Sequence, residues 1–161
     1  MRNAFTDREA TSTTQTYAEL HDDGSSVLAF PVASTPTEYD GRKEPRSAIK
    51  ATYVQVVCAS AVVLADAWLM TQRITAEASM LASIVTSPVD TEPVWAISDV
   101  PGGRARILPT TRPLTRILPV DTFLAFPRDL PRMRAAAMDL AESILHQFGI
   151  EHLNQLALPE D

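Results

Sequence analysis

Neither glycine nor proline occurs between Arg46 and Ser87, although the 161-residue chain holds 12 prolines and 5 glycines. The centre of this stretch, residues 51–65 (ATYVQVVCASAVVLA), also lacks any charged side chain. A run this long without breakers or charge is not typical of an exposed loop. It has to be buried against something, so we expect it to organise the fold.

Cysteine is almost absent, since Cys58 is the only one and lies inside the apolar run. A single cysteine excludes an intrachain disulfide and a zinc site built from cysteines. We interpret Cys58 as a small buried hydrophobic residue and not as a nucleophile. Because no feature points to an oxidising compartment, we expect a cytoplasmic protein, or a virion-associated one if it comes from a phage.

The sequence also lacks a clear membrane signal. The fully uncharged run is 15 residues long and is flanked by Lys50 and Asp66, whereas a membrane span needs about 20 predominantly apolar residues. The first 16 residues contain no apolar core of the kind found in signal peptides. We therefore expect a buried element of a soluble protein and no membrane partner.

Lysine and asparagine are scarce, and the chain is acidic overall. Arginine outnumbers lysine 12 to 2, a bias typical of a GC-rich bacterium or one of its phages or mobile elements. The formal net charge of −6 argues against non-specific binding of nucleic acid, because the phosphate backbone repels an acidic chain. The length and the 45% hydrophobic content fit one globular domain.

The pattern along the chain predicts an α+β domain over residues 17–161, preceded by a flexible polar arm over residues 1–16. Residues 17–33 form a predicted hairpin around Asp23-Gly24, and residues 94–108 form a second around Gly102-Gly103. The segments LTRIL (114–118) and DTFLAF (121–126) read as further strands. We expect a small antiparallel sheet from the two hairpin regions, with a long central helix and a C-terminal helix packed on one face.

The type of the central element is open at its start. Its valines favour a strand, whereas its length and its alanines favour a helix. As a helix, it has one wide stripe and a smaller set on the other side, so it is central to a core or shared with a partner. The wide stripe contains Ile49, Tyr53, Val56, Val57, Ser60, Val63, Leu64, Ala67 and Trp68, and the smaller set contains Val54, Ala61, Val62 and Ala65.

Polar residues at 71–73 predict a break, and a second helix is expected over residues 75–85. The clearest helix is expected over residues 129–148, with Asp129 near the N-cap, Pro131 in the first turn and Gly149 after the end. A short terminal helix is expected to place Ile150, Leu153 and Leu156 on one side.

Few residues suggest chemistry. His21, Asp22 and Asp23 cluster at the first turn, where they could bind a metal or act as acid and base, but Asp-Asp-Gly is itself a turn signal. His146 and His152 are six residues apart and do not share a helical face. The sequence therefore predicts no catalytic residue, no cofactor and no metal.

Seven arginines lie within residues 104–134 against two aspartates, which gives this segment +5 and leaves −11 for the remainder. Guanidinium groups suit carboxylates and phosphates, so the segment could dock an acidic partner, another copy of the chain or nucleic acid. Pairing with acidic residues of the same subunit is the simplest alternative. The predicted partner-binding residues are Arg104, Arg106, Arg112, Arg116, Arg128, Arg132 and Arg134, together with the apolar tail residues Ile150, Leu153 and Leu156.

Three functions follow from these features. The favoured one is a non-enzymatic interaction or structural protein that forms a homo-oligomer or docks into a larger assembly through its arm, its tail and its split charge. The second is a regulator that binds an acidic protein or nucleic acid through the arginines. The third is an enzyme of unknown type with a site near the turn at residues 21–26.

Overall fold

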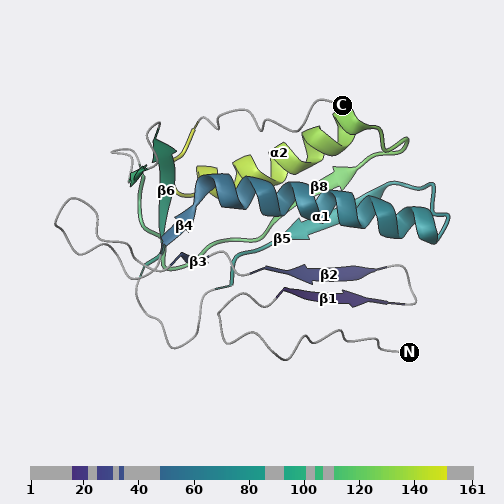
Figure 1. Cartoon of the computed structure of the whole chain (residues 1–161), viewed down its shortest axis with the longest axis horizontal. Coiled ribbons are helices and arrows are strands. Elements are labelled where there is room, and N and C mark those ends of the chain that lie inside the picture. The colour runs from purple at the N-terminus through teal and green to yellow at the C-terminus, as the bar shows by residue number, and fades with distance from the viewer. Residues whose placement is uncertain are drawn as a thin grey trace.

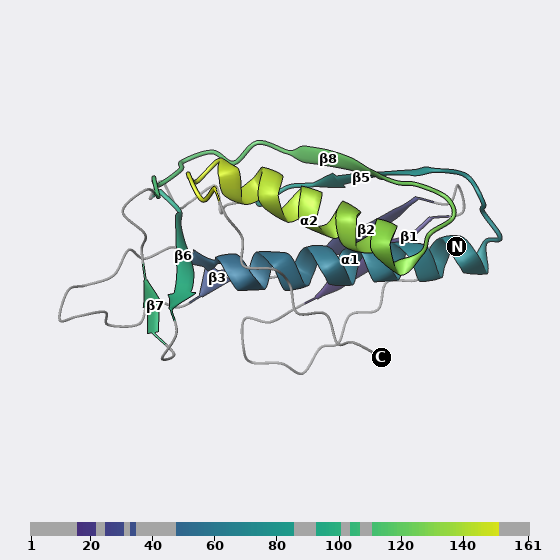
Figure 2. The same cartoon turned by 90° about the horizontal axis from the view of Figure 1, so that it is seen from above.

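A computed structural model describes residues 16–21, 25–30, 33–34, 48–85, 93–100, 104–106 and 111–151. These residues form two long helices and eight short strands, which confirms the α+β class. The helices lie side by side and run in opposite directions, and both lie on one side of a two-stranded ribbon (Figures 1 and 2). A separate four-stranded sheet lies at one end of the helix pair (Figure 1).

The central element is the helix α1 (Ala51–Thr71), which continues directly from the strand β4 (Ala48–Lys50). Its β-branched valines have modest helix propensity, so packing against the second helix has to stabilise it. The residues of α1 that are buried lie on a single face: Ala51, Val54, Gln55, Cys58, Val62 and Leu69. Two of these buried residues, Val54 and Val62, belong to the smaller apolar set that the sequence analysis placed opposite the wide stripe.

The second helix, α2 (Leu130–His146), confirms the predicted C-terminal helix. Asp129 is its N-cap and accepts a hydrogen bond from the Arg132 backbone N–H at 3.0 Å, and Pro131 lies in the first turn. Its buried residues Ala136, Ala137, Leu140, Ala141, Ile144 and Leu145 face α1 and the ribbon, and Phe148 and Ile150 extend the same core.

The ribbon pairs β5 (Ala78–Ala82) with β8 (Val120–Leu124) in antiparallel register, with Met80 opposite Thr122. The helix predicted over residues 75–85 is therefore wrong, because residues 78–82 alternate between half-buried and exposed side chains and pair with β8 as a strand. The chain reverses direction between α1 and this strand. The backbone N–H groups of Arg73 and Ile74 donate to Met70 and Leu69, and Arg73 has a φ of 55°. This Schellman turn ends the helix and sends the chain back toward β8.

The remaining strands form two groups. The predicted first hairpin is confirmed as β1 (Tyr17–Leu20) paired antiparallel with β2 (Ser26–Ala29), and it lies below α1 in Figure 1. The second is confirmed as β6 (Trp95–Val100) with β7 (Arg104–Arg106). β4 joins β6 in parallel and β3 (Ala33–Ser34) in antiparallel pairing. Both turn tips, the N-terminal arm and the predicted terminal helix lie outside the described residues.

The segment at residues 111–119 has no regular strand, so the strand predicted at 114–118 is wrong; Leu114 makes only an isolated bridge with Val94. Side-chain hydrogen bonds attach this segment to the end of α2 instead. The Leu118 backbone N–H donates to Gln147 Oε1 at 2.8 Å, and Gln147 Nε2 donates to the Leu118 carbonyl at 3.0 Å. The Arg112 backbone N–H donates to the Phe148 carbonyl.

Candidate functional site

The side of α1 that faces away from α2 is apolar and exposed. We call it the outer face of α1 and define it by Tyr53, Val56, Ser60, Val63, Ala67 and Met70. Val56 is 51% exposed, Val63 54% and Met70 65%. Tyr53 and Ala67 are also exposed, and Ser60 is half-buried. The wide stripe found in the sequence is therefore mostly turned to solvent and not to the core.

No charged side chain lies on the outer face, because Asp66 is the only charged residue in α1. Asp66 points instead toward Arg128, whose Nε donates to its Oδ1 at 2.6 Å. The side chains of Asp66 and Arg128 are only 15% and 5% exposed. The one charge of α1 is therefore neutralised inside the protein.

Arg128 holds three segments together. Besides the bond to Asp66, its Nη2 donates to the Ile74 carbonyl at 2.7 Å and its Nη1 to the Ala76 carbonyl at 3.2 Å. The guanidinium also lies 5.4 Å from the centre of the Phe126 ring. A planar fork with several donors suits such a site better than an ammonium group, and these contacts leave Arg128 buried within the subunit.

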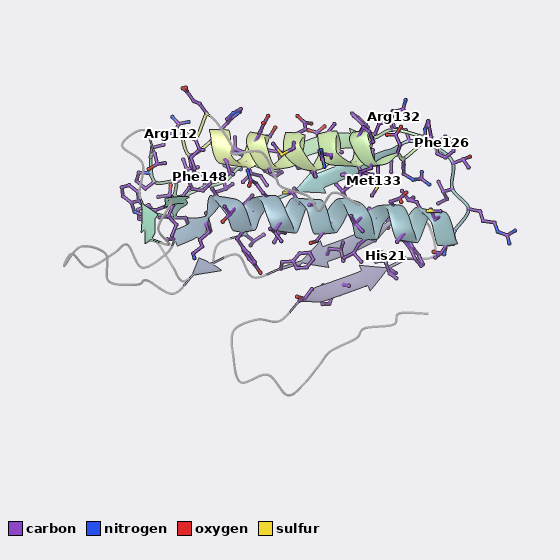
Figure 3. The ribbon with its side chains drawn as sticks, turned by 45° about the horizontal axis from the view of Figure 1, so that its top comes forward. His21, Arg112, Phe126, Arg132, Met133 and Phe148 are labelled. Atoms are coloured by element: carbon purple, nitrogen blue, oxygen red, sulfur yellow. The ribbon has the colours of Figure 1, made fainter. Side chains whose placement is uncertain are left out.

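The other predicted partner-binding arginines do not gather on one surface. Arg112 and Arg132 lie at opposite ends of α2 (Figure 3). Arg112 Nε donates to the Gln147 carbonyl at 2.8 Å, and Arg132 Nη1 donates to the Pro127 carbonyl at 2.8 Å and lies 3.5 Å from Asp129. Arg116 and Arg134 are exposed, and Arg104 and Arg106 bound β7.

Of the three apolar tail residues predicted to bind a partner, the structure describes one, Ile150. Ile150 is buried, and its backbone N–H donates to the Leu145 carbonyl as part of the turn that ends α2. Leu153 and Leu156 lie outside the described residues. Within the described part of the chain, the tail therefore contributes to the subunit core.

The turn around His21 shows a structural hydrogen bond. The His21 backbone N–H donates to the Ser25 carbonyl at 2.9 Å, which closes the β1–β2 hairpin. Figure 3 shows His21 on this hairpin, below α1. Asp22 and Asp23 lie outside the described residues, and among those that are described no group of three or more His, Cys, Asp or Glu side chains could hold a metal ion.

A shallow hollow of about 310 Å³ lies between β8 and the first half of α2. Its lining holds one cation and one carboxylate, Arg132 and Asp139, and otherwise small or apolar side chains with a single hydroxyl: Thr122, Phe123, Ala125, Ala135 and Ala136. The opposite charges do not favour an anion or a cation.

Cys58 lies in the core on the inner face of α1, as the sequence predicts. Burial raises the pKa of its thiol to about 11. The thiolate is the reactive form of cysteine, so this environment suppresses nucleophilic and redox chemistry at neutral pH.

α1 is also long and apolar enough to cross a membrane by length and composition alone, with a mean hydropathy of 1.7 in its most apolar window. Within that window 28% of the residues are buried in the protein. The core helix of a soluble protein can meet the same criteria of length and composition.

No family model matches the chain, and neither the curated proteins nor the solved structures contain a match. The candidate site therefore depends on geometry alone. The signal that could have located it is the spacing of Tyr53, Val56, Ser60, Val63, Ala67 and Met70, which alternates between three and four residues and contains no charge.

Proposed function

We propose that the chain is a non-enzymatic interaction or structural protein that self-associates. The observation that supports this proposal is the outer face of α1, an exposed apolar surface without charge that runs the length of a 21-residue helix. Soluble monomers rarely expose contiguous apolar surface of this extent unless another molecule covers it.

The outer side of the ribbon is mixed by comparison with the outer face of α1. On the ribbon, Leu81 of β5 is 74% exposed and Phe123 of β8 is 57% exposed. Both side chains alternate with inward-facing residues of their strands, so they lie on the same outer side of the ribbon. Ser79 lies opposite Phe123 and Asp121 lies opposite Leu81, and both are exposed on this side as well. The outer side of the ribbon therefore carries a charge, unlike the outer face of α1, and is not part of the proposed contact.

The experiment is the mass of the purified protein in solution, measured by light scattering on a sizing column over a range of concentrations. We expect a defined oligomer that dissociates on dilution. The measurement is repeated at low and high salt, because contacts between opposite charges weaken with salt whereas apolar contacts do not. A monomer at every concentration and at both salts would contradict the proposal.

A further inference from the structure

We infer that the outer face of α1 binds the same face of a second copy of the chain, with the two α1 helices antiparallel about a two-fold axis. This inference depends on the proposed self-association and specifies the surface that carries it. The spacing of the residues, their sizes and the absence of charge all favour this arrangement.

The spacing selects a helix as the partner. Tyr53, Val56, Ser60, Val63, Ala67 and Met70 follow one another at intervals of 3, 4, 3, 4 and 3 residues. This is the average period of 3.5 residues that keeps one face of a helix in contact with another helix along its length. The outer face therefore has the seam pattern of a helix pair, and within the described residues α2 occupies the opposite face.

The order of large and small side chains selects an antiparallel copy of the same helix. With a two-fold axis between residues 61 and 62, Val56 lies opposite the partner's Ala67, and Ser60 lies opposite the partner's Val63. Each valine then meets a small residue, as close packing requires.

The ends of the seam match as well. In the same register Tyr53 lies opposite the partner's Met70, and a thioether beside an aromatic ring is a favourable contact. All three pairings place the axis at the same point, close to the middle of Ala51–Thr71. A parallel pair would instead place Val63 against the partner's Val63 and Ser60 against the partner's Ser60, which alternates crowding with gaps.

The seam contains no charge that association would have to desolvate. The residues beside it in α1 are Thr52, Val57, Ala59, Leu64, Asp66 and Thr71, and Asp66 is already paired with Arg128 at 2.6 Å. Association through this face should therefore persist at high salt, in contrast to docking by split charge. The seam from Tyr53 to Met70 is about 26 Å long. One pair of helices of this length makes a small contact compared with stable interfaces, so we expect the dimer to dissociate on dilution.

The first experiment compares two double variants with the wild type by light scattering over a dilution series. Val56→Lys/Val63→Lys places ammonium groups in the seam, and we expect its dissociation constant to rise more than about a hundredfold because these charges would be desolvated. The matched control is Leu81→Lys/Phe123→Lys, which makes the same kind of change on the exposed ribbon and should leave dimerisation unchanged. Circular dichroism checks that both variants keep the helix content of the wild type.

The second experiment tests the direction of the helices with a short bis-maleimide cross-linker. In the antiparallel dimer, Tyr53→Cys mixed with Met70→Cys should link, while each variant alone should not, because its two cysteines would lie about 26 Å apart. The wild type controls for the native Cys58, which is buried and has a raised pKa. This measurement stays informative even if the lysine variant fails to fold.

The outcomes separate the two proposals. A wild-type dimer that persists in Val56→Lys/Val63→Lys, or links formed by Tyr53→Cys alone, would overturn the antiparallel seam and leave self-association intact. A wild-type monomer would overturn both proposals. If that monomer also floats with phosphatidylcholine–phosphatidylglycerol vesicles, lipid and not a second copy covers the outer face.

Discussion

The two helices of this protein bury similar inner faces and present opposite kinds of outer face. α2 turns Arg132, Arg134 and Asp139 to solvent. α1 turns Tyr53, Val56 and Met70 to solvent, and it keeps its only charge inside the subunit. The subunit core thus buries one face of each helix. The outer face of α2 is charged and is readily hydrated, whereas the outer face of α1 is apolar and is not.

The helices also end differently, although both use the same turn. Ile74 donates to the Leu69 carbonyl after α1, as Ile150 donates to the Leu145 carbonyl after α2. The left-handed position of the turn is Gly149 after α2, with a φ of 82°, but Arg73 after α1, with a φ of 55°. Glycine is the residue that this conformation favours, so only the turn after α2 has the preferred residue type.

The largest expected effect comes from exposing the hidden charge of α1. Arg128→Met leaves Asp66 without its partner in a site where both side chains are mostly buried. We expect the free energy of unfolding to fall by about 3–5 kcal/mol, as it does when one partner of a buried ion pair is removed. Urea denaturation followed by circular dichroism measures the change.

The control for this pair is Arg132→Met, because Arg132 and Asp129 are 3.5 Å apart but about half exposed. That exposed pair should contribute less than about 1 kcal/mol. Equal losses in the two variants would show that burial of the Asp66–Arg128 pair is not what makes it important.

The next prediction tests whether the two inner faces are equivalent. Leu145→Ala in α2 and Leu69→Ala in α1 each remove a buried side chain, and each should lower the free energy of unfolding by about 2–5 kcal/mol. Leu81→Ala removes an exposed leucine and serves as the control, with an expected change within about 0.5 kcal/mol. If Leu69→Ala behaved like the control, the inner face of α1 would not belong to the core.

A third prediction uses the buried thiol of α1. The pKa of Cys58 is about 11 in the folded protein and 9.0 for the unperturbed group. Because the folded state holds its proton more tightly, the stabilisation is complete below pH 9 and is lost as the pH rises toward 11.

The expected loss is about 2–3 kcal/mol over that window. It is measured as the difference in unfolding free energy between the wild type and Cys58→Ala at pH 8, 9, 10 and 11, since the variant removes the thiol and keeps the other titrating groups. A difference that stays constant with pH would indicate that solvent reaches Cys58 in the folded state.

The smallest effect should come from making the two helix ends alike. Arg73→Gly removes the steric cost of a left-handed conformation in a residue with a Cβ atom. We expect the protein to gain about 1 kcal/mol of stability. The greater conformational entropy that glycine gives the unfolded chain offsets part of this gain. Thermal unfolding measures it, and Gly149→Ala should shift the midpoint in the opposite direction.

The sequence predicted the elements whose signals are local. Asp129, Pro131 and Gly149 mark the ends of α2, and the two hairpins were recognised from turn residues between apolar segments. It did not predict β5, because a strand of five residues depends on its pairing with β8, some 40 residues further along the chain. The parallel pairing of β4 with β6 is non-local in the same way.

The candidate site shows a similar limit. The sequence indicated that α1 is apolar nearly all round, but not which side α2 covers, because Val54 and Val56 are equally apolar in isolation. Arg112, Arg128 and Arg132 were predicted to share one partner-binding surface because they lie close together in the sequence. In the structure, Arg112 and Arg132 lie at opposite ends of α2 and are exposed, whereas the side chain of Arg128 is buried and paired with Asp66.

The side-chain amide of Gln147 has a consequence for amide hydrogen exchange. It donates to and accepts from the backbone of Leu118 as a neighbouring strand would, so an irregular segment is hydrogen-bonded to the end of α2. The Leu118 amide can exchange with solvent only when this contact opens. We therefore expect residues 112–118 and the last turn of α2 to open together, although nearly 30 residues separate Leu118 from Gln147 along the chain.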